Sequence, residues 1–491
     1  MNDQTLYIST SIPYVNAAPH LGFAQELVIA DAMARHYQRR GFDVRFQTGS
    51  DENSLKNVRA AQDAGMPVED WVASHAEQFR SLKETLDLSF DDFIRTSSEQ
   101  RHALGVEALW QHCMAGGDLY RRHYRGLYCV GCEQFYEPGE LVDGACPEHL
   151  APLEMVEEEN WFFRLSRYAE PLRKLIETDV LHVQPAKRKR EVLDFIDRGL
   201  HDFSVSRSRE RAHGWGIPVP GDPDQVLYVW FDALGNYVSA LGYGSDDDRL
   251  FSRYWTHAAR RIHVIGKGVV RFHAIYWPAM LLSAGVPLPT EARIHDYLTV
   301  DGIKITKSRG NAIGPGEAVA RHGVDAVRYY LLRHVRTTED GDFSYARLAD
   351  VYRTELADGL GNLLSRTLGL IQPGMELPGC VCDSELSELV DRLPRVIDTA
   401  VESFQLHQGL RMIWRLVDAA NAYVSRREPW KLAREGDETG LREVLDDLLT
   451  VLERLAEALA PFLPTTARRI QDATSRARRG ERSVAVLFPK H

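Results

Sequence analysis

The sequence has few cysteines and no long apolar run. Among 491 residues there are six cysteines, too few for a chain of this length to depend on a disulfide framework. No run of about 18 uninterrupted apolar residues occurs, which argues against a membrane-spanning helix. The first four residues lack the charged and apolar regions of a signal peptide. We therefore expect a cytoplasmic protein whose cysteines stay reduced.

An excess of positive charge is also missing. The chain has 59 lysines and arginines against 70 aspartates and glutamates, a net charge of −11, which excludes a protein whose whole surface attracts polyanions but leaves local basic patches open. With 44% apolar and 26% charged residues, it is neither a fibrous repeat nor a disordered chain. Its length suggests about three domains.

The first fifty residues alternate between extended and helical patterns. A β-rich run at Leu6–Thr10 is followed by apolar residues at helical spacing between Phe23 and Tyr37. A glycine then ends the helix and residues 44–49 are again extended, so this stretch predicts a βαβ unit and a parallel sheet. A second apolar strand, at Arg261–Lys267, leads into another helical pattern. We expect an α/β fold with a Rossmann-like nucleotide-binding domain that is split in sequence.

After about residue 345 helical periodicity replaces the strand patterns. Apolar residues recur at helical spacing in 356–370, 386–404, 409–425 and 441–463, with breaks expected at Pro373, Pro394 and Pro429. This pattern predicts an α-helical bundle. The predicted domains are a catalytic domain at 1–117 and 216–309, an insertion at 118–215, a connecting region at 310–350 and the bundle at 351–491.

A short motif lies where the first strand leads into the first helix. It contains Pro19, His20 and Gly22. Free backbone N–H groups at a helix start favour a phosphate, a histidine there can bind a charged oxygen, and a glycine lets a ligand approach the backbone. The alternative is that His20 only caps the helix and Gly22 only permits packing.

A second motif is a lysine-rich loop nearly three hundred residues later. It holds Lys304, Lys307 and Ser308 beside a glycine. Lysines supply mobile positive charge for a triphosphate and its departing pyrophosphate, where charge grows in the transition state. The alternative is a solvated basic loop.

Two cysteine-containing pairs have the spacing of a metal site. Cys129 and Cys132 form the first pair, and Cys146 is followed three residues later by His149. Four such ligands give a closed tetrahedral site, so we expect a structural zinc ion. The alternative is four unlinked buried residues. The other three cysteines fall outside this spacing and are expected to be ordinary thiols.

Within the predicted bundle, polar and aromatic residues suggest a surface that reads bases. Asn362 and Arg366 lie four apart on one helical face, and Trp430 follows a proline. Such side chains hydrogen-bond base edges and stack on unpaired bases. The alternative is that they cap and pack helices.

The two phosphate motifs, in this order around a split sheet, resemble the HIGH and KMSKS signatures of class I aminoacyl-tRNA synthetases. Further stretches narrow the resemblance to the methionyl-tRNA synthetase family, and they cover most of the chain. They are Ile12-Pro13-Tyr14-Val15-Asn16, Gly49-Ser50-Asp51-Glu52-Asn53, Val229-Trp230-Phe231-Asp232-Ala233, and Gly266-Lys267 with Phe272-His273.

The resemblance implies a two-step reaction. Methionine and ATP, with magnesium, give methionyl-adenylate and pyrophosphate, and the methionyl group then moves to the 3′ end of initiator and elongator methionine tRNA. The implied methionine-binding residues are Ile12, Tyr14, Asp51, Trp230, Ala233, Tyr237, Val269 and His273. Those for ATP are Pro19, His20, Gly22, Gly266, Lys304, Lys307 and Ser308, with His20, Lys304 and Lys307 catalytic. Asn362, Arg366 and Trp430 would read the anticodon, and we expect a monomer.

The sequence departs from the family pattern at two positions. Phe23 stands where most relatives carry the second histidine of the HIGH motif, and Asn53 stands where many carry a histidine. Because phenylalanine cannot donate a hydrogen bond to phosphate, we expect Phe23 to lower adenylation or to alter inhibitor sensitivity without abolishing function. The alternatives are a catalytically impaired tRNA-binding paralogue and a class I synthetase for another apolar amino acid.

Overall fold

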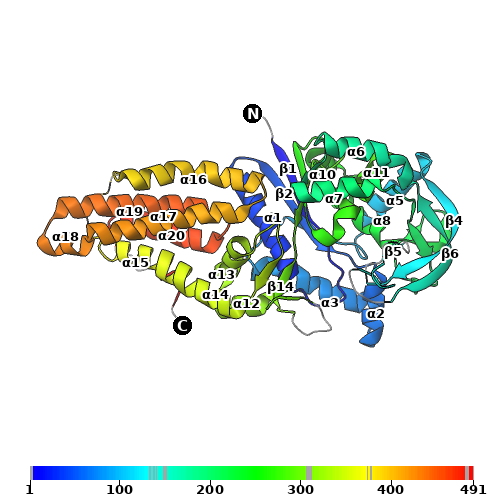
Figure 1. Cartoon of the computed structure of the whole chain (residues 1–491), viewed down its shortest axis with the longest axis horizontal. Coiled ribbons are helices and arrows are strands. Elements are labelled where there is room, and N and C mark those ends of the chain that lie inside the picture. Colours follow the sequence, from blue (N-terminus) through cyan, green and yellow to red (C-terminus); the bar gives the residue numbers. More distant parts are fainter. Residues whose placement is uncertain are drawn as a thin grey trace. The chain divides into compact units, whose positions relative to one another are not determined.

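A computed structural model describes most of the chain (Figure 1). It covers residues 4–131, 134–136, 139, 141–147, 152–305, 312–372, 374–375, 377, 379–481 and 486–489, without the side chains of residues 134 and 304. The chain folds into two compact units. Unit 1 comprises Met1–Pro19, Gly41–Ser81 and Phe90–Ile294, and unit 2 comprises His20–Arg40, Leu82–Ser89 and His295–His491.

The centre of unit 1 is a six-stranded parallel sheet. Its order is β3-β2-β1-β12-β13-β7, with β1 at Thr5–Thr10, β2 at Asp43–Ser50, β3 at Asp92–Arg95, β7 at His182–Gln184, β12 at Arg260–Gly266 and β13 at Glu291–His295. All six residues of β1 are buried. The chain connects β1 to β2 through α1 (Leu21–Arg39), which confirms the predicted βαβ unit and parallel sheet. The edge strand β7 comes from within 118–215.

The strand order reverses at β1. From β1 the chain builds outward through β2 and β3, and it later returns to place β12 on the other side of β1. In parallel sheets such a reversal opens a crevice at the carboxyl ends of the two central strands, where ligands bind. The segments that follow β1 and β12 therefore line the expected ligand site.

Helices and two smaller antiparallel sheets complete unit 1. The helices are α2 (Leu55–Asp63), α3 (Val68–Arg80), α5 (Gln100–Ala115), α6 (Ala169–Glu177), α7 (Ala186–Asp197), α8 (Val229–Leu234), α9 (Asn236–Ser239), α10 (Arg249–Phe251) and α11 (Trp277–Ala284). One sheet has the order β5-β4-β6-β8, from Gln134–Tyr136, Leu119–Cys129, Glu154–Phe163 and Phe203–Ser204, and the other β10-β11-β9, from Pro218–Val219, Asp222–Leu227 and Ser206–Ser208. Buried aromatic rings join these elements into one core that includes Trp110 and Trp277.

Unit 2 contains a small sheet and the predicted helical bundle. The sheet joins β14 (Leu298–Val300), β15 (Ile303–Lys304) and β16 (Gly341–Phe343). The helices besides α1 are α4 (Leu82–Thr85), α12 (Pro315–His322), α13 (Val324–Tyr329), α14 (Tyr345–Val351), α15 (Asn362–Leu368), α16 (Ser384–Glu402), α17 (Leu406–Arg427), α18 (Pro429–Glu435), α19 (Glu438–Leu459) and α20 (Pro464–Arg478). Helices α16, α17 and α19 pack side by side (Figure 1). Among the described residues, no helix has the length and apolar character to cross a membrane.

The break predicted at Pro394 is wrong. Helix α16 runs through Pro394, although proline lacks the N–H that would bind the carbonyl of residue 390. Leu393 and Ile397, on either side, are both buried. Their packing against the rest of the bundle outweighs the local cost, so helix α16 continues across the proline. The break predicted at Pro429 is confirmed, because α17 ends at Arg427 and α18 begins at Pro429. The break predicted at Pro373 lies outside the described residues.

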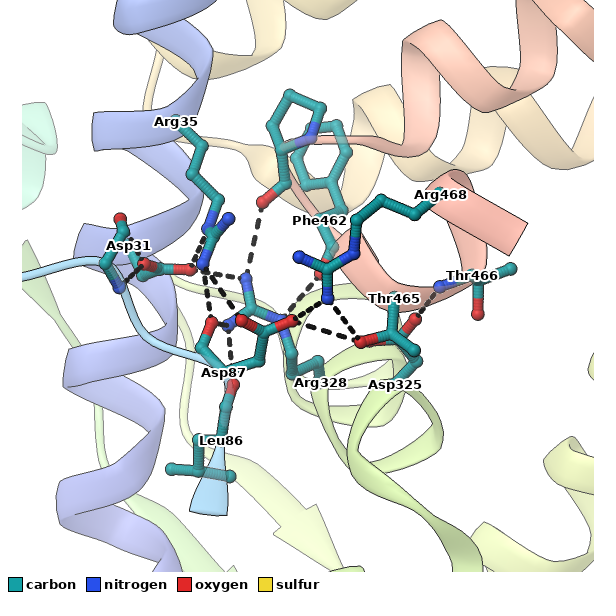
Figure 2. A network of polar contacts seen from close by, with 12 residues as sticks. Asp31, Arg35, Leu86, Asp87, Asp325, Arg328, Phe462, Thr465, Thr466 and Arg468 are labelled. Atoms are coloured by element: carbon teal, nitrogen blue, oxygen red, sulfur yellow. Dashed lines mark hydrogen bonds and ion pairs between the residues drawn. The ribbon is translucent and has the colours of Figure 1, made fainter. Parts of the chain in front are cut away.

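A buried arginine connects four segments of unit 2 (Figure 2). Nη2 of Arg328, on α13, lies 2.7 Å from Asp31 on α1, and neither side chain is exposed. The same guanidinium donates to the carbonyls of Phe462, at 2.8 Å, and Leu86, at 3.0 Å. Because a guanidinium carries five donors in a fixed fork, Arg328 connects α13 to α1, to the segment after α4 and to the segment before α20.

Candidate active site

The predicted methionine-binding residues of unit 1 gather at the carboxyl ends of three parallel strands. Ile12 and Tyr14 follow β1, Asp51 follows β2 directly, and Val269 lies three residues after the end of β12. Tyr14 and Asp51 form an isolated parallel bridge, and Asp51 is only 2% exposed. A largely buried carboxylate thus stands beside the crevice that the strand order predicts.

A tyrosine and a histidine satisfy each other's polar atoms in this region. Nδ1 of His273 lies 2.8 Å from the carbonyl oxygen of Val269. A carbonyl only accepts hydrogen bonds, so in the neutral imidazole Nδ1 carries the proton and Nε2 accepts one. The hydroxyl of Tyr237 lies 2.6 Å from that Nε2 and donates to it. The pair presents aromatic faces without leaving a buried donor or acceptor unmatched.

Aromatic rings form a second side of the same region. The indole of Trp230, on α8, stacks on Phe272 with a centroid distance of 3.5 Å and an angle of 5°. Tyr14 meets Trp230 edge to face at 6.4 Å. Ala233 lies three residues after Trp230 on the same short helix and is buried. A small side chain among large rings leaves room for a slender apolar group such as a thioether.

Sequence reasoning missed a histidine that supports the aromatic wall formed by Tyr14, Trp230, Tyr237 and Phe272. His263 lies in β12, where its ring is 4.1 Å from that of Tyr237. Its Nε2 accepts the indole N–H of Trp277 at 3.2 Å and its Nδ1 lies 2.6 Å from the Ser9 hydroxyl. Burial, with smaller effects of His273 and an arginine, holds the pKa of His263 well below its usual value, so the ring is neutral. The available signal was a titratable residue inside an otherwise apolar strand.

A second missed histidine holds the stretch that contains Trp230. Nε2 of His102 lies 2.5 Å from one oxygen of Asp232, and Asn53 donates to the other oxygen at 2.7 Å. His102 and Asp232 are fully buried. Asn53, which departs from the family pattern, thus ties the end of β2 to α8. Nothing in the sequence near His102 indicated this role.

The first phosphate motif lies at the start of α1, and its His20 and Gly22 belong to unit 2. Nδ1 of His20 accepts the backbone N–H of Gly22 at 3.1 Å, so the imidazole caps the helix. In the neutral ring Nε2 then carries the proton, and burial lowers the pKa of His20. Among the described residues Nε2 has no hydrogen-bond partner. A Cβ at Gly22 would lie 3.0 Å from the imidazole, so a larger residue there would require the ring to shift by a few tenths of an ångström.

Parts of two predicted sites lie outside the described residues. In the lysine-rich loop this applies to the side chain of Lys304 and to all of Lys307 and Ser308. At the predicted zinc site it applies to Cys132 and His149.

The two described cysteines of the zinc motif share one small buried cluster. Cys129 ends β4, and Cys146 contacts the hydroxyl of Tyr136 at 3.6 Å. This cluster is separate from the main core of unit 1. The described residues contain no group of three or more metal-binding side chains. Two of the four predicted zinc ligands are thus described, and both belong to this cluster.

The predicted base-reading residues lie together in the bundle. The guanidinium of Arg366, on α15, lies 5.3 Å from the centre of the Trp430 ring. Arg366 is exposed and Trp430 is half-buried. Asn362 lies one helical turn before Arg366 on the same face. Trp414, by contrast, is buried in the bundle core.

A cavity of about 840 Å³ lies in unit 1 and is large enough for a ligand. Its lining includes Arg122, Arg271 and Phe272. Phe203 and Tyr276, which also line it, stack at 4.2 Å. Because Phe272 also stacks on Trp230, the cavity adjoins the aromatic wall described above.

Comparison with known proteins gives consistent matches over almost the whole chain. The family model described as "tRNA synthetases class I (M)" matches residues 6–154 and 149–368. The chain is 39% identical to the methionine–tRNA ligase of Caldanaerobacter subterraneus subsp. tengcongensis, over 99% of this chain and 79% of that protein. It is 40% identical to that of Brucella suis biovar 1, over 96% and 92%.

Solved structures give the same picture. The Mycobacterium tuberculosis methionyl-tRNA synthetase in complex with methionyl-adenylate is similar to this chain with a TM-score of 0.89 and 36% identity, over 99% of both chains. The apo form of that enzyme gives a TM-score of 0.81 and 33% identity, over 100% of this chain and 97% of that one.

Proposed function

The chain belongs to the methionyl-tRNA synthetase family of class I tRNA synthetases, and on that premise we propose which of its residues carry each part of the reaction. The activity is that of a methionine–tRNA ligase, which activates methionine with ATP and charges tRNA. The observation that carries the assignment is the buried carboxylate of Asp51 beside an aromatic pocket at the strand reversal.

Asp51 receives the ammonium group of methionine. Its near-complete burial supports this role, because a carboxylate in such a place gains most from a cationic partner. The thioether lies against Tyr14, Trp230, Ala233, Tyr237, Val269 and His273, with Ile12 at the end of β1. The Tyr237–His273 pair offers the polarisable sulfur an aromatic environment. A leucine side chain lacks that polarisability.

ATP is bound by the two phosphate motifs. Nε2–H of His20 donates to a phosphate oxygen at the start of α1, where the helix dipole also favours negative charge. Pro19, Gly22 and Gly266 leave the backbone open to the nucleotide. Lys304, Lys307 and Ser308 neutralise the departing pyrophosphate. ATP enters as its magnesium complex, to which we assign no protein ligand.

Transfer to tRNA uses two surfaces. The aromatic and arginine-lined cavity beside Phe272 suits the unpaired 3′ end, because single-stranded bases stack on such rings. In the bundle, Arg366 and Trp430 form a base-stacking surface for the anticodon, and Asn362 supplies a hydrogen-bonding group on the same face.

The remaining assignments follow the sequence. A structural zinc ion is held by Cys129, Cys132, Cys146 and His149, and metal analysis is expected to return about one zinc per chain. The catalytic domain comprises 1–117 and 216–309, the insertion 118–215, the connecting region 310–350 and the anticodon-binding bundle 351–491. We propose a cytoplasmic monomer.

The first test is amino-acid-dependent ATP–pyrophosphate exchange with purified protein. Methionine is compared with leucine, isoleucine, valine and cysteine, and the Phe23→His variant is measured in parallel. Exchange with methionine alone supports the pocket. Exchange with another amino acid would reassign the specificity. A folded wild type without exchange, restored by Phe23→His, would make the wild-type chain a tRNA-binding paralogue.

The second test addresses the anticodon surface. Arg366→Ala and Trp430→Ala are expected to raise the KM for methionine tRNA about tenfold, since stacking is worth about 1–3 kcal/mol per base. Pyrophosphate exchange without tRNA should stay unchanged. Arg392→Ala is the matched control, because Arg392 is also an exposed arginine, on α16, and is paired with Glu388. Equal losses in both assays would refute the assignment.

A further inference from the structure

Two cysteines outside the zinc motif lie side by side on the surface of the bundle. Cys380 and Cys382 precede α16, and their sulfur atoms are 3.7 Å apart. Both are exposed, whereas Cys113, Cys129 and Cys146 are buried. From the sequence all cysteines outside the zinc spacing were expected to be ordinary thiols. The two-residue spacing of Cys380 and Cys382 did not reveal that their sulfur atoms lie close together.

Two neighbouring carboxylates of α19 hold this segment in place. Asp446 accepts the backbone N–H groups of Gly379, at 2.9 Å, and Cys380, at 3.2 Å. Asp447 accepts the backbone N–H of Cys382 at 2.6 Å. Asp446 is itself ion-paired with Arg478 on α20. The backbone on both sides of the sulfur pair is thus anchored, and the two thiols stay within reach of each other.

We propose that Cys380 and Cys382 form a redox-active dithiol, which closes to an intramolecular disulfide on reaction with a low-molecular-weight disulfide such as glutathione disulfide. Closure requires the sulfur atoms to approach from 3.7 Å to the about 2 Å of a disulfide. Side-chain rotation on an exposed segment supplies this movement without displacing buried groups. A ring closed between residues two apart is small and exposed, which makes such a disulfide readily reducible.

The exchange proceeds in two balanced steps. The thiolate of Cys382 attacks one sulfur of glutathione disulfide, which forms a mixed disulfide and releases one glutathione. Cys380 then loses its proton to solvent and attacks the Cys382 sulfur, which forms the intramolecular bond and releases the second glutathione. Hydrogen bonds that the Cys380 thiol donates to Cys382 and to Asp446 raise the pKa of Cys380 to about 11. Cys380 therefore keeps its proton at neutral pH and serves as the resolving thiol.

The pair is connected to the proposed anticodon surface. Asp447, which binds the backbone of Cys382, also accepts the hydroxyl of Tyr423 at 2.6 Å. Tyr423 lies in the last turns of α17, and Trp430 follows on α18. We expect the contraction at the cysteines to pull on this contact and to weaken tRNA binding. This consequence rests on the proposed role of Trp430, whereas the disulfide itself does not.

The chemical test maps the disulfide in the full chain. Reduced protein, freed of reductant, is incubated with about 1 mM glutathione disulfide. The effective concentration of the neighbouring thiol is also in the millimolar range, so Cys380 can compete with glutathione for the mixed disulfide. Free thiols are then blocked with N-ethylmaleimide and the digest is analysed by mass spectrometry. The peptide with both cysteines should be lighter by two hydrogens and unlabelled, and dithiothreitol should restore both labelling sites.

Single variants sharpen this test. In Cys380→Ser the resolving thiol is gone, so Cys382 should retain a glutathione adduct that the wild type resolves. Cys113→Ser is the matched control and should form the disulfide like the wild type. Two free thiols, or two glutathione adducts on the wild-type peptide, would overturn the proposal.

The functional test compares oxidised and reduced protein in two assays. Oxidation should raise the KM for methionine tRNA several-fold and leave pyrophosphate exchange unchanged. The Cys382→Ser variant, which cannot close a disulfide, should show no change in this KM after treatment with the oxidant. If the disulfide forms and charging is unaffected, the connection to Trp430 is refuted. If Trp430→Ala itself leaves charging intact, the anticodon assignment fails, and the disulfide is judged by mass spectrometry alone.

Discussion

Replacing Arg328 by alanine is expected to destabilise unit 2 far more than the same replacement of a neighbouring arginine. The substitution removes the donors to the carbonyls of Leu86 and Phe462 and one of those to Asp31. Each unsatisfied buried acceptor costs about 1–3 kcal/mol. Asp31 keeps hydrogen bonds from the Ser89 backbone, at 2.6 Å, and the Ser89 hydroxyl, at 2.7 Å, so its own loss is partly compensated. Asp31 also keeps its ion pair with Arg35, at 2.8 Å, so most of the expected total of about 3–5 kcal/mol comes from the two unsatisfied carbonyls.

The assay must report on unit 2 separately, because a chain with two compact units need not unfold in one step. Native-state hydrogen exchange with mass spectrometry provides this resolution. Amides of α1 and α13 should exchange roughly 100- to 4,000-fold faster in Arg328→Ala, since each 1.4 kcal/mol corresponds to about a factor of ten. Peptides from β1 and β2 should change little.

Two further variants make the reasoning falsifiable. Arg468→Ala removes an arginine of the same network that is 62% exposed and paired with Asp87, and its cost should stay below about 1 kcal/mol. Arg328→Lys keeps a charge for Asp31 but lacks the planar fork, so its loss of stability should lie between those of Arg468→Ala and Arg328→Ala. If Arg328→Ala and Arg468→Ala accelerate exchange equally, the four-segment connection does not carry the stability we assign to it.

The other predictions concern the site and its pH dependence. Gly22→Ala should displace the His20 ring, which a new Cβ would approach to 3.0 Å, and should lower kcat/KM in pyrophosphate exchange about 10²-fold with the KM for methionine unchanged. Tyr237→Phe should leave a buried imidazole acceptor unsatisfied and raise the KM for methionine about tenfold, while the KM for ATP stays constant. Burial alone would lower the pKa of His295, but the hydrogen bond and charge of Glu26 outweigh it and raise that pKa above the ordinary 6.5. The stabilisation by this pair is therefore complete below pH 6.5 and lost as pH rises through the raised value, and Tm measured against pH should lose this slope in Glu26→Gln.

Local sequence patterns were sufficient for the elements that surround the pocket. The apolar run at β1, the helical spacing of α1 and the later strand β12 each have a clear period, and their order predicts a parallel sheet. Ile12, Tyr14 and Asp51 lie just after strands, but the full set of pocket residues was implied by the family resemblance and not by the strand pattern. The helical spacing of apolar residues in 409–425 predicts a buried face, and Trp414 in that stretch is buried.

Contacts between distant segments could not be anticipated in this way. Pro394 was expected to end a helix because the local rule was applied without the packing of its buried neighbours. The supporting roles of His102 and His263 depend on partners far away in sequence. The sulfur pair depends on two carboxylates of α19 that anchor its backbone, and a spacing of two residues carries no signal of its own.

The division of the chain between the two units has a consequence for its synthesis. The polypeptide passes between them five times, at 19/20, 40/41, 81/82, 89/90 and 294/295. Arg328 emerges from the ribosome 297 residues after Asp31, and Phe462 follows 134 residues later. At about 5–20 residues per second, Asp31 waits roughly 15–60 s for its buried partner. Until Arg328 has been made, Asp31 has Arg35 of its own helix as an ion-pair partner, and the connection among the four segments closes only after Phe462 has followed. A chain interrupted before α13 would lack the guanidinium that joins these segments and would be a natural target for chaperones and proteases.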